Sequence, residues 1–210
     1  MSANTTTTSD VLDALYASNS CGYSKADWVA MHKSIGYTFG TKPADYDTAR
    51  LGDCMPEVAT FADKAAAGKT RGLVITGETG RGKTYTACAI ARHVSETHSV
   101  GILTDAQILE ACKDTFGART SERAVIERIC APYLLVIDDL GKAAYTDWAL
   151  QTIFSCIDRR GHKPLIVTTQ YNASGLKTKL TCNGDSSTAE AILSRFRAFD
   201  KLHLEGMDRR

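Results

Sequence analysis

Four short runs of consecutive apolar residues alternate along the chain with segments in which apolar residues recur every three or four positions. The apolar runs lie at residues 72–77, 100–104, 133–139 and 164–170, and a fifth strand is expected at residues 201–206. Continuous apolar runs are typical of strands buried on both faces, and the intervening spacing is typical of amphipathic helices. Strands and helices that alternate in this way form a parallel sheet with helices on both faces. The pattern therefore predicts a three-layer α/β fold around a five-stranded parallel sheet.

The helical segments have recognisable boundaries. Residues 56–68 place apolar side chains on one helical face, with Pro56 suited to the first turn and Gly68 to the stop. Further helices are expected to begin at Lys83 and to run through residues 108–116, 125–129, 150–157 and 192–199. Residues 172–187 are polar and predict a loop.

The first quarter of the chain carries weaker signals. Residues 1–8 are polar and rich in threonine, and we expect them to be disordered. Between residues 21 and 53 the periodicity is too weak to predict helices or strands. We therefore divide the chain into an N-terminal extension, residues 1–54, and one domain, residues 55–210.

A glycine-rich loop joins the first apolar run to the helix at Lys83. Residues 77–84 match the pattern G-x-x-x-x-G-K-[ST]. The glycines of this motif let backbone N–H groups point at phosphate oxygens, next to the positive end of a helix. Lys83 is expected to reach the terminal phosphates, and the Thr84 hydroxyl to bind Mg²⁺. The candidate nucleotide-binding residues are Gly77, Glu78, Thr79, Gly80, Arg81, Gly82, Lys83, Thr84 and Tyr85.

An acidic pair ends the third apolar run, in the segment "YLLVIDDLG". Ligands of open α/β sheets bind at the carboxyl ends of the strands, where Asp138 and Asp139 would lie. Asp138 is the expected partner of Mg²⁺, and Asp139 is expected to polarise the attacking water or to sense the γ-phosphate. Together with the glycine-rich loop, this pair predicts an ATP site with Mg²⁺ as its metal ion.

Composition excludes several classes of protein. The net charge of +1 gives no global field that would attract nucleic acid. No apolar run approaches the ~20 residues of a membrane span, and the N-terminus lacks the pattern of a signal peptide, so we expect a cytoplasmic location and no membrane partner. The seven cysteines are scattered and never form C-x-x-C, which favours a structural role over metal binding.

From residue 55 to 210 the chain resembles AAA+ ATPases, a class of P-loop (ASCE) NTPases, and more narrowly the DnaC/DnaI-type helicase loaders and the IstB-type transposition helpers. The resemblance rests on "GETGRGKTYTACAIARHV", on "LLVIDDLGKAAYTDWALQTIFSCIDRR", on "KPLIVTTQYN" and on "AILSRFRAF". It implies that Gln170 stands where the family usually has its sensor asparagine. It also implies that Arg195 is an arginine finger for a neighbouring subunit.

Other arginines have weaker claims. Arg160, at the end of the helix through residues 150–157, is a second candidate for the subunit interface, and Arg197 is expected to be a solvated surface residue. Only four residues follow Gly206, so the resemblance implies that the helical lid of AAA+ proteins is absent or vestigial. Arg209 or Arg210 would then substitute for the arginine that the lid carries. Residues 1–54 do not resemble the helicase-binding domain of full-length loaders.

The resemblance implies an ATPase in DNA replication that loads or remodels a replicative helicase on single-stranded DNA and self-associates through its ATP sites. Two alternatives stay open: an IstB-like ATPase that assists a transposase, and a slow nucleotide-dependent DNA-binding switch. Asp139 is a methylene shorter than the glutamate of many AAA+ enzymes, which predicts slow turnover, stimulated by a partner. The candidate DNA contacts are Lys177, Lys179, Arg119 and Arg123.

A small-molecule kinase on the same core is less favoured. Such an enzyme needs an acceptor pocket and usually an arginine-rich mobile lid. The polar segment 172–187 offers only Lys177 and Lys179.

Overall fold

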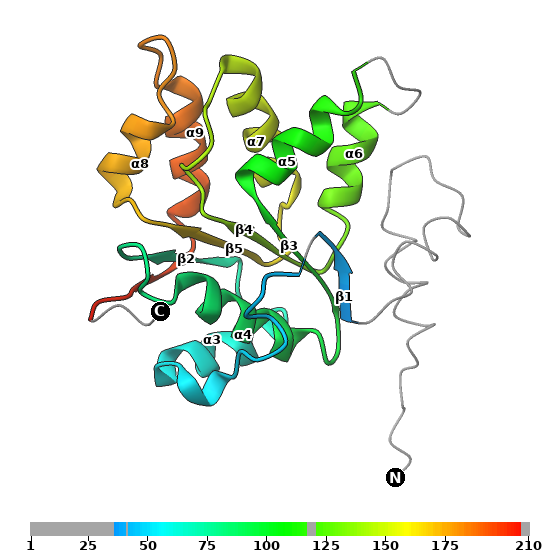
Figure 1. Cartoon of the computed structure of the whole chain (residues 1–210), viewed down its shortest axis with the longest axis vertical. Coiled ribbons are helices and arrows are strands. Elements are labelled where there is room, and N and C mark those ends of the chain that lie inside the picture. The colour runs from blue at the N-terminus through cyan, green and yellow to red at the C-terminus, as the bar shows by residue number, and fades with distance from the viewer. Residues whose placement is uncertain (1–35, 41, 117–120, 207–210) are drawn as a thin grey trace.

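The computed structural model of the chain describes residues 36–40, 42–116 and 121–206 (Figure 1). The strands are β1 (Gly36–Phe39), β2 (Gly72–Thr76), β3 (Ser99–Thr104), β4 (Leu134–Asp138), β5 (Leu165–Thr169) and β6 (Asp200–His203). The α-helices are α3 (Pro56–Ala66), α4 (Lys83–Val94), α5 (Asp105–Lys113), α6 (Glu122–Ile129), α7 (Asp147–Arg159), α8 (Ala173–Lys179) and α9 (Ser187–Phe196). A short 3-10 helix, η1 (Leu51–Asp53), precedes α3.

All pairings between these strands are parallel, in the order β1-β3-β4-β5-β2-β6. The five predicted strands are all present, so the predicted α/β class and its parallel sheet are confirmed. A sixth strand, β1, pairs with β3 at one edge and was not predicted. The four residues of β1 are too few to show the two-residue period of a strand. Their partner, β3, lies about 60 positions further along the chain, so no local pattern reveals the pairing.

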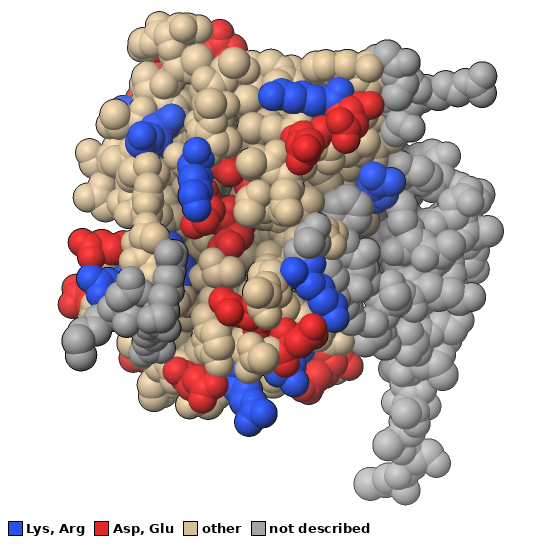
Figure 2. All heavy atoms as spheres, in the orientation of Figure 1, with Lys and Arg blue, Asp and Glu red and all other residues tan. Residues whose placement is uncertain are grey.

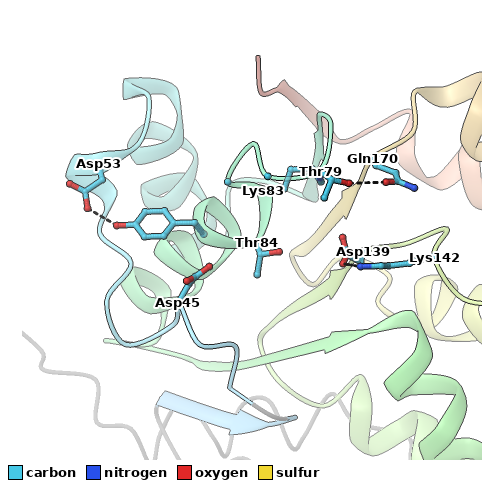
Figure 3. Close-up of a pocket in the computed structure, with 11 residues that line it drawn as sticks. Asp45, Asp53, Thr79, Lys83, Thr84, Asp139, Lys142 and Gln170 are labelled. Atoms are coloured by element: carbon cyan, nitrogen blue, oxygen red, sulfur yellow. Dashed lines mark hydrogen bonds and ion pairs between the residues drawn. The ribbon is translucent and has the colours of Figure 1, made fainter. Parts of the chain in front are cut away.

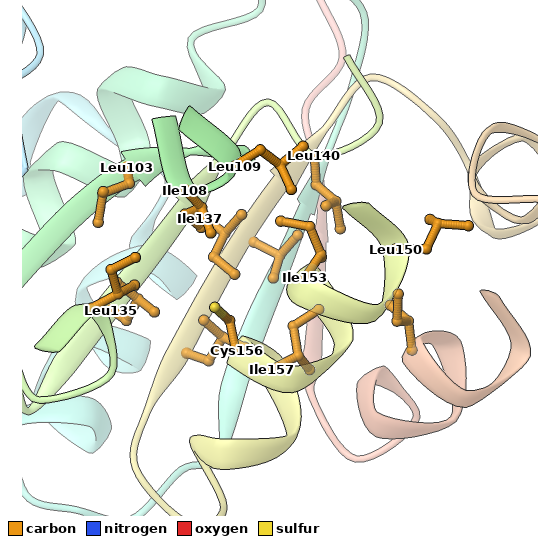
Figure 4. Close-up of a cluster of buried hydrophobic side chains, with 14 of the residues drawn as sticks. Leu103, Ile108, Leu109, Leu135, Ile137, Leu140, Leu150, Ile153, Cys156 and Ile157 are labelled. Carbon is orange, nitrogen blue, oxygen red and sulfur yellow. The ribbon is translucent and has the colours of Figure 1, made fainter. Parts of the chain in front are cut away.

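Helices cover both faces of the sheet (Figure 1): α3 and α4 lie on one face, and α5 to α9 lie on the other. All five residues of β4 are buried. Leu135 and Ile137 belong to the core under α5, α6 and α7, which Figure 4 shows, whereas Leu134 and Val136 belong to the core under α3 and α4. Side chains of a strand alternate between faces, so the continuous apolar run follows from burial on both sides.

Residues 42–54 pack against the domain that follows them. Tyr46 and Ala49 are 5% and 1% exposed and belong to the core under α3 and α4. Arg92 on α4 donates from Nη1 to the carbonyls of Asp47 and Ala49, at 2.9 and 3.1 Å. The last part of the predicted N-terminal extension is thereby attached to α4. Residues 1–8, for which disorder was predicted, lie outside the described residues.

Two local predictions are wrong. The segment 172–187 contains α8, which Asn172 caps by accepting a hydrogen bond from the N–H of Gly175 at 2.8 Å. Leu176 is the single buried apolar residue of α8, so the sequence shows no repeat of apolar positions that would predict this helix. The helix predicted through residues 108–116 ends at Lys113, and Phe116 lies beyond it with 65% of its surface exposed. No helix in the described ranges is long and apolar enough to cross a membrane.

Candidate nucleotide-binding site

A cavity of about 510 Å³ lies at the carboxyl ends of β2, β4 and β5 (Figure 3). Its lining residues come from the glycine-rich loop, from the segments after β4 and β5, and from the chain before α3. They are Asp45, Asp53, Thr79, Gly80, Gly82, Lys83, Thr84, Tyr85, Asp139, Lys142 and Gln170. The order of the strands places these segments together, because the carboxyl ends of parallel strands share one edge of the sheet.

The glycine-rich loop has the backbone that its sequence predicts. Gly82, immediately before α4, has a φ of 80°, which a residue with a side chain rarely adopts. A Cβ on Gly77 would lie 2.6 Å from the carbonyl oxygen of Leu204, next to β6, so only glycine fits there. The loop delivers the chain to the first turn of α4, where unpaired N–H groups and the helix dipole favour an anion.

Lys83 lies at the floor of the cavity and is 6% exposed. Its Nζ donates to the carbonyl oxygen of Glu78 at 2.8 Å, so the ammonium lies inside the curl of the loop. Of the other predicted binding residues, Gly77, Glu78 and Arg81 do not line the cavity, and Arg81 instead pairs with Glu78 at 2.6 Å.

A hydroxyl and a carboxylate form the candidate metal site. Thr84 Oγ1 donates to the two carboxylate oxygens of Asp138, at 3.1 and 2.9 Å. Thr168 on β5 donates to the Asp138 Oδ1 at 2.5 Å and was not predicted as a site residue. Burial raises the pKa of Asp138, and the hydrogen bonds from Thr168 and Thr84 oppose that rise. A hydroxyl next to a carboxylate at the end of this cavity fits Mg²⁺, which takes few protein oxygens and completes its shell with phosphates and water.

Asp139 and Gln170 lie at the same end of the cavity (Figure 3). Asp139 has a φ of 58°, a left-handed conformation that aspartate tolerates better than most residues. The N–H of Asp139 donates to Thr168 Oγ1 at 2.9 Å, and its carboxylate pairs with Lys142 at 2.9 Å. Gln170 Oε1 accepts a hydrogen bond from Thr79 at 3.1 Å, so the residue after β5 contacts the glycine-rich loop directly.

The chain before α3 closes the other side of the cavity. The hydroxyl of Tyr85 donates to Asp53 Oδ2 at 2.5 Å and accepts from the N–H of Arg50 at 3.2 Å. The bond to Asp53 raises the pKa of Tyr85. Asp45 and Asp53 were not predicted, because they lie in a stretch without periodicity and only the fold brings them to the cavity.

Asp105, which belongs to none of the predicted sites, organises the segment that follows β4. It is 1% exposed, at the start of α5. Its Oδ2 accepts from the backbone N–H groups of Gly141, Lys142 and Ala143, at 3.1, 3.2 and 3.1 Å, and from the Tyr145 hydroxyl. Burial raises the pKa of Tyr145, and the negative charge of Asp105 raises it further. A buried carboxylate with four donors fixes this segment, which carries one wall of the cavity.

The candidate interface arginines lie away from the cavity. Arg195 is half-exposed on α9, pairs with Asp158 at 2.6 Å and stacks its guanidinium over the Phe154 ring at 5.7 Å. Arg197 is exposed. Arg209, Arg210 and Arg119 lie outside the described residues.

The prediction that Arg160 lies at a subunit interface is wrong, because this residue is only 3% exposed. Its guanidinium donates to carbonyl oxygens at the amino end of the sheet, the end opposite the cavity. These belong to Cys130 at 2.8 Å, Pro132 at 2.6 Å, Tyr133 at 2.5 Å and Pro164 at 2.7 Å. The residue therefore has a structural role in joining the loops before β4 and β5.

Known proteins resemble this chain in sequence and in fold. The IstB-like ATP binding protein family matches residues 41–206. An ATP-binding protein of insertion sequence IS1162 from Pseudomonas fluorescens is 29% identical over 119 residues, which are 56% of this chain and 51% of the relative. The chain thus spans about half the length of that curated relative.

Among solved structures, the fold is similar to that of DnaI, with a TM-score of 0.68 and 22% identity over 83% of this chain and 97% of the other. The DnaC helicase loader gives a TM-score of 0.64 and 20% identity over 78% and 100% of the two chains. At these identities the likeness concerns the fold alone. The match over residues 41–206, joined to the cavity above, shows that the chain belongs to the IstB-like ATP-binding protein family.

Proposed function

We propose that the chain binds ATP with Mg²⁺, hydrolyses it slowly, and uses the nucleotide to control assembly with other copies and with a protein partner on DNA. The observation that carries the proposal is the Thr84–Asp138 pair, with Asp139 on the same cavity. The Thr84–Asp138 pair would supply the protein ligands of a metal ion. The Asp139 carboxylate would accept a proton from the attacking water.

Each residue then has a defined task. The loop N–H groups and Lys83 would hold the β- and γ-phosphates, and Thr84 with Asp138 would hold Mg²⁺, which supplies charge neutralisation when bound. Asp139 would orient and polarise the attacking water. Gln170 would contact the γ-phosphate from the end of β5. Asp53, which accepts a hydrogen bond from Tyr85, lies on the side of the cavity away from Asp139, where the remainder of the nucleotide would bind (Figure 3).

Asp139→Asn is expected to retain ATP binding and to lower the hydrolysis rate at least about 100-fold, because an amide cannot accept the proton of the attacking water. Phosphate release under saturating ATP measures the rate, and the ATP dissociation constant is measured in parallel. Asp63→Asn, on the exposed face of α3 and outside the cavity, is the matched control. Unchanged hydrolysis in the Asp139 variant would remove this residue from the mechanism.

Arg195→Ala is expected to lower hydrolysis about a thousandfold under conditions where subunits meet, because an arginine finger stabilises transition-state charge. Arg195 does not line the cavity of its own chain. We therefore expect a mixture of the Arg195→Ala and Asp139→Asn variants to regain turnover, measured as phosphate release against total protein concentration. A mixture as inactive as its two components would contradict action between subunits.

A transposase is the protein partner that we favour. The curated relative comes from an insertion sequence, which supports a role in transposition, whereas the likeness to helicase loaders concerns the fold. A replicative helicase is the second candidate. Contact with single-stranded DNA has little support: on the face in Figure 2, Lys and Arg alternate with Asp and Glu. Lys177 pairs with Glu190 at 2.8 Å, and Arg123 with Glu127 at 3.0 Å.

Affinity capture tests the partner. The Asp139→Asn variant, held with ATP, is used as bait in lysate of the source cell, and the Lys83→Ala variant is the control without nucleotide. Recovery of a transposase above the control would support the favoured partner, and recovery of a replicative helicase would support the second candidate. Recovery of neither would contradict this part of the proposal and leave the ATP site in place.

A further inference from the structure

We propose that Lys142 is a second phosphate-binding lysine, which leaves Asp139 when ATP binds and contacts the γ-phosphate. The inference rests on the proposed ATP site. It adds a residue that distinguishes ATP from ADP, because only ATP has a phosphate at that position.

Lys142 lies on the side of the cavity that the γ-phosphate would occupy. Figure 3 shows Lys142, Asp139 and Gln170 on one side, and Asp45 and Asp53 on the other. Of the described residues that line the cavity, only Lys83 and Lys142 are lysines or arginines. Lys83 reaches the cavity from the first turn of α4, and Lys142 from the segment after β4. The two ammonium groups can therefore approach a triphosphate from different directions.

The backbone of Lys142 is fixed, whereas its side chain is exposed. The carboxylate of Asp105 holds three consecutive N–H groups, including that of Lys142, and is itself 1% exposed. The side chain of Lys142 is 72% exposed and pairs with Asp139 at 2.9 Å. A flexible four-carbon stem on a fixed base can exchange one oxygen partner for another without a change in the fold.

Charge favours this exchange. Asp139 lines the cavity next to the position that the terminal phosphate would take, and the buried Asp138 carboxylate lies behind Thr84, which also lines it. Exposed ion pairs such as Lys142–Asp139 contribute little, so the pair breaks easily, and a phosphate is a stronger acceptor with more negative charge. Moving the ammonium to the phosphate would also leave the Asp139 carboxylate available to accept a proton from water.

The test compares nucleotides with and without a γ-phosphate. Calorimetric titrations of the full chain with Mg²⁺ and either AMPPCP or ADP give the two dissociation constants. We expect Lys142→Gln to weaken AMPPCP binding about tenfold and to change ADP binding less than about twofold, because one charge-assisted hydrogen bond to phosphate is lost. Lys142→Arg should retain most of the affinity. Lys69→Gln, at an exposed lysine next to the amino end of β2, is the matched control and should change neither constant.

The same titrations contain the results that would overturn the inference. Equal losses for AMPPCP and ADP, or no loss for either, would show that Lys142 does not contact the γ-phosphate. If the loss for AMPPCP disappears when Lys142→Gln is combined with Asp139→Asn, Lys142 acts only through Asp139, which also overturns the inference. In both cases wild-type binding would leave the ATP site intact. A wild-type chain that binds neither nucleotide would overturn the ATP site and this inference together.

Discussion

Lys83→Ala is expected to weaken ATP binding at least about 100-fold while the chain stays folded. The Lys83 ammonium lies in the curl of the glycine-rich loop, where it donates to the carbonyl of Glu78. Two charge-assisted hydrogen bonds to phosphates contribute about 1.5 kcal/mol or more each, and about 1.4 kcal/mol corresponds to a tenfold change in affinity. The loss should affect both ATP and ADP, because the β-phosphate is common to both.

Fluorescence titration with a labelled ATP and a labelled ADP measures this effect, and circular dichroism checks the fold. Lys69→Ala removes an exposed lysine far from the cavity and should leave both affinities unchanged. A Lys83 variant that binds ATP within a few-fold of the wild type would contradict the assignment of the cavity. This outcome is distinct from a failure at Lys142, which concerns the γ-phosphate alone.

Arg160→Ala is expected to lower the free energy of unfolding by about 4 kcal/mol, the largest stability effect of any single substitution that we propose. The guanidinium is 3% exposed and holds carbonyl groups of the loops before β4 and β5. Without it these buried acceptors lose their donors, at about 1–3 kcal/mol for each unsatisfied group that water does not reach. Burial lowers the pKa of Arg160 to about 10, so the side chain stays charged at neutral pH.

Urea denaturation followed by circular dichroism measures this change. The neighbouring Arg159 provides the matched control, because it is 41% exposed and pairs with Glu127 at 3.0 Å on the surface. Arg159→Ala should cost no more than about 1 kcal/mol. Equal losses for the two variants would contradict the structural role of Arg160. Arg160→Lys should recover only part of the stability, since one ammonium cannot reach all the carbonyls that the planar guanidinium holds.

Prediction from the sequence succeeded where the signal is local. The strands β2 to β5 were predicted because each lies in a short apolar run, and α3 was predicted with its first-turn proline and its glycine stop. The glycine-rich loop was located because its backbone demands glycine at fixed spacing. Asp138 and Asp139 follow an apolar run, and the structure places them at the carboxyl end of β4, the edge at which ligands bind in open α/β sheets.

Prediction failed where a residue depends on distant parts of the chain. Arg160 has the sequence context of an exposed helix end, and only the approach of two loops turns it into a buried donor. Asp105 resembles any acidic first-turn residue, and only the parallel pairing of β3 with β4 brings it to the segment after β4. The helix α8 has one buried apolar side chain, so its stability comes from capping and tertiary contacts.

By itself the sequence determined the α/β class and the positions of the glycine-rich loop and the acidic pair, because these depend on apolar periodicity and on backbone geometry that neighbouring residues specify. Only the tertiary structure decided which polar side chains meet. It brings Asp53 to Tyr85 and aligns Asp138 through Thr168 on β5. The physical reason is that hydrogen bonds and ion pairs act over about 3 Å, and the partners that come within this distance are set by strand order and by helix packing.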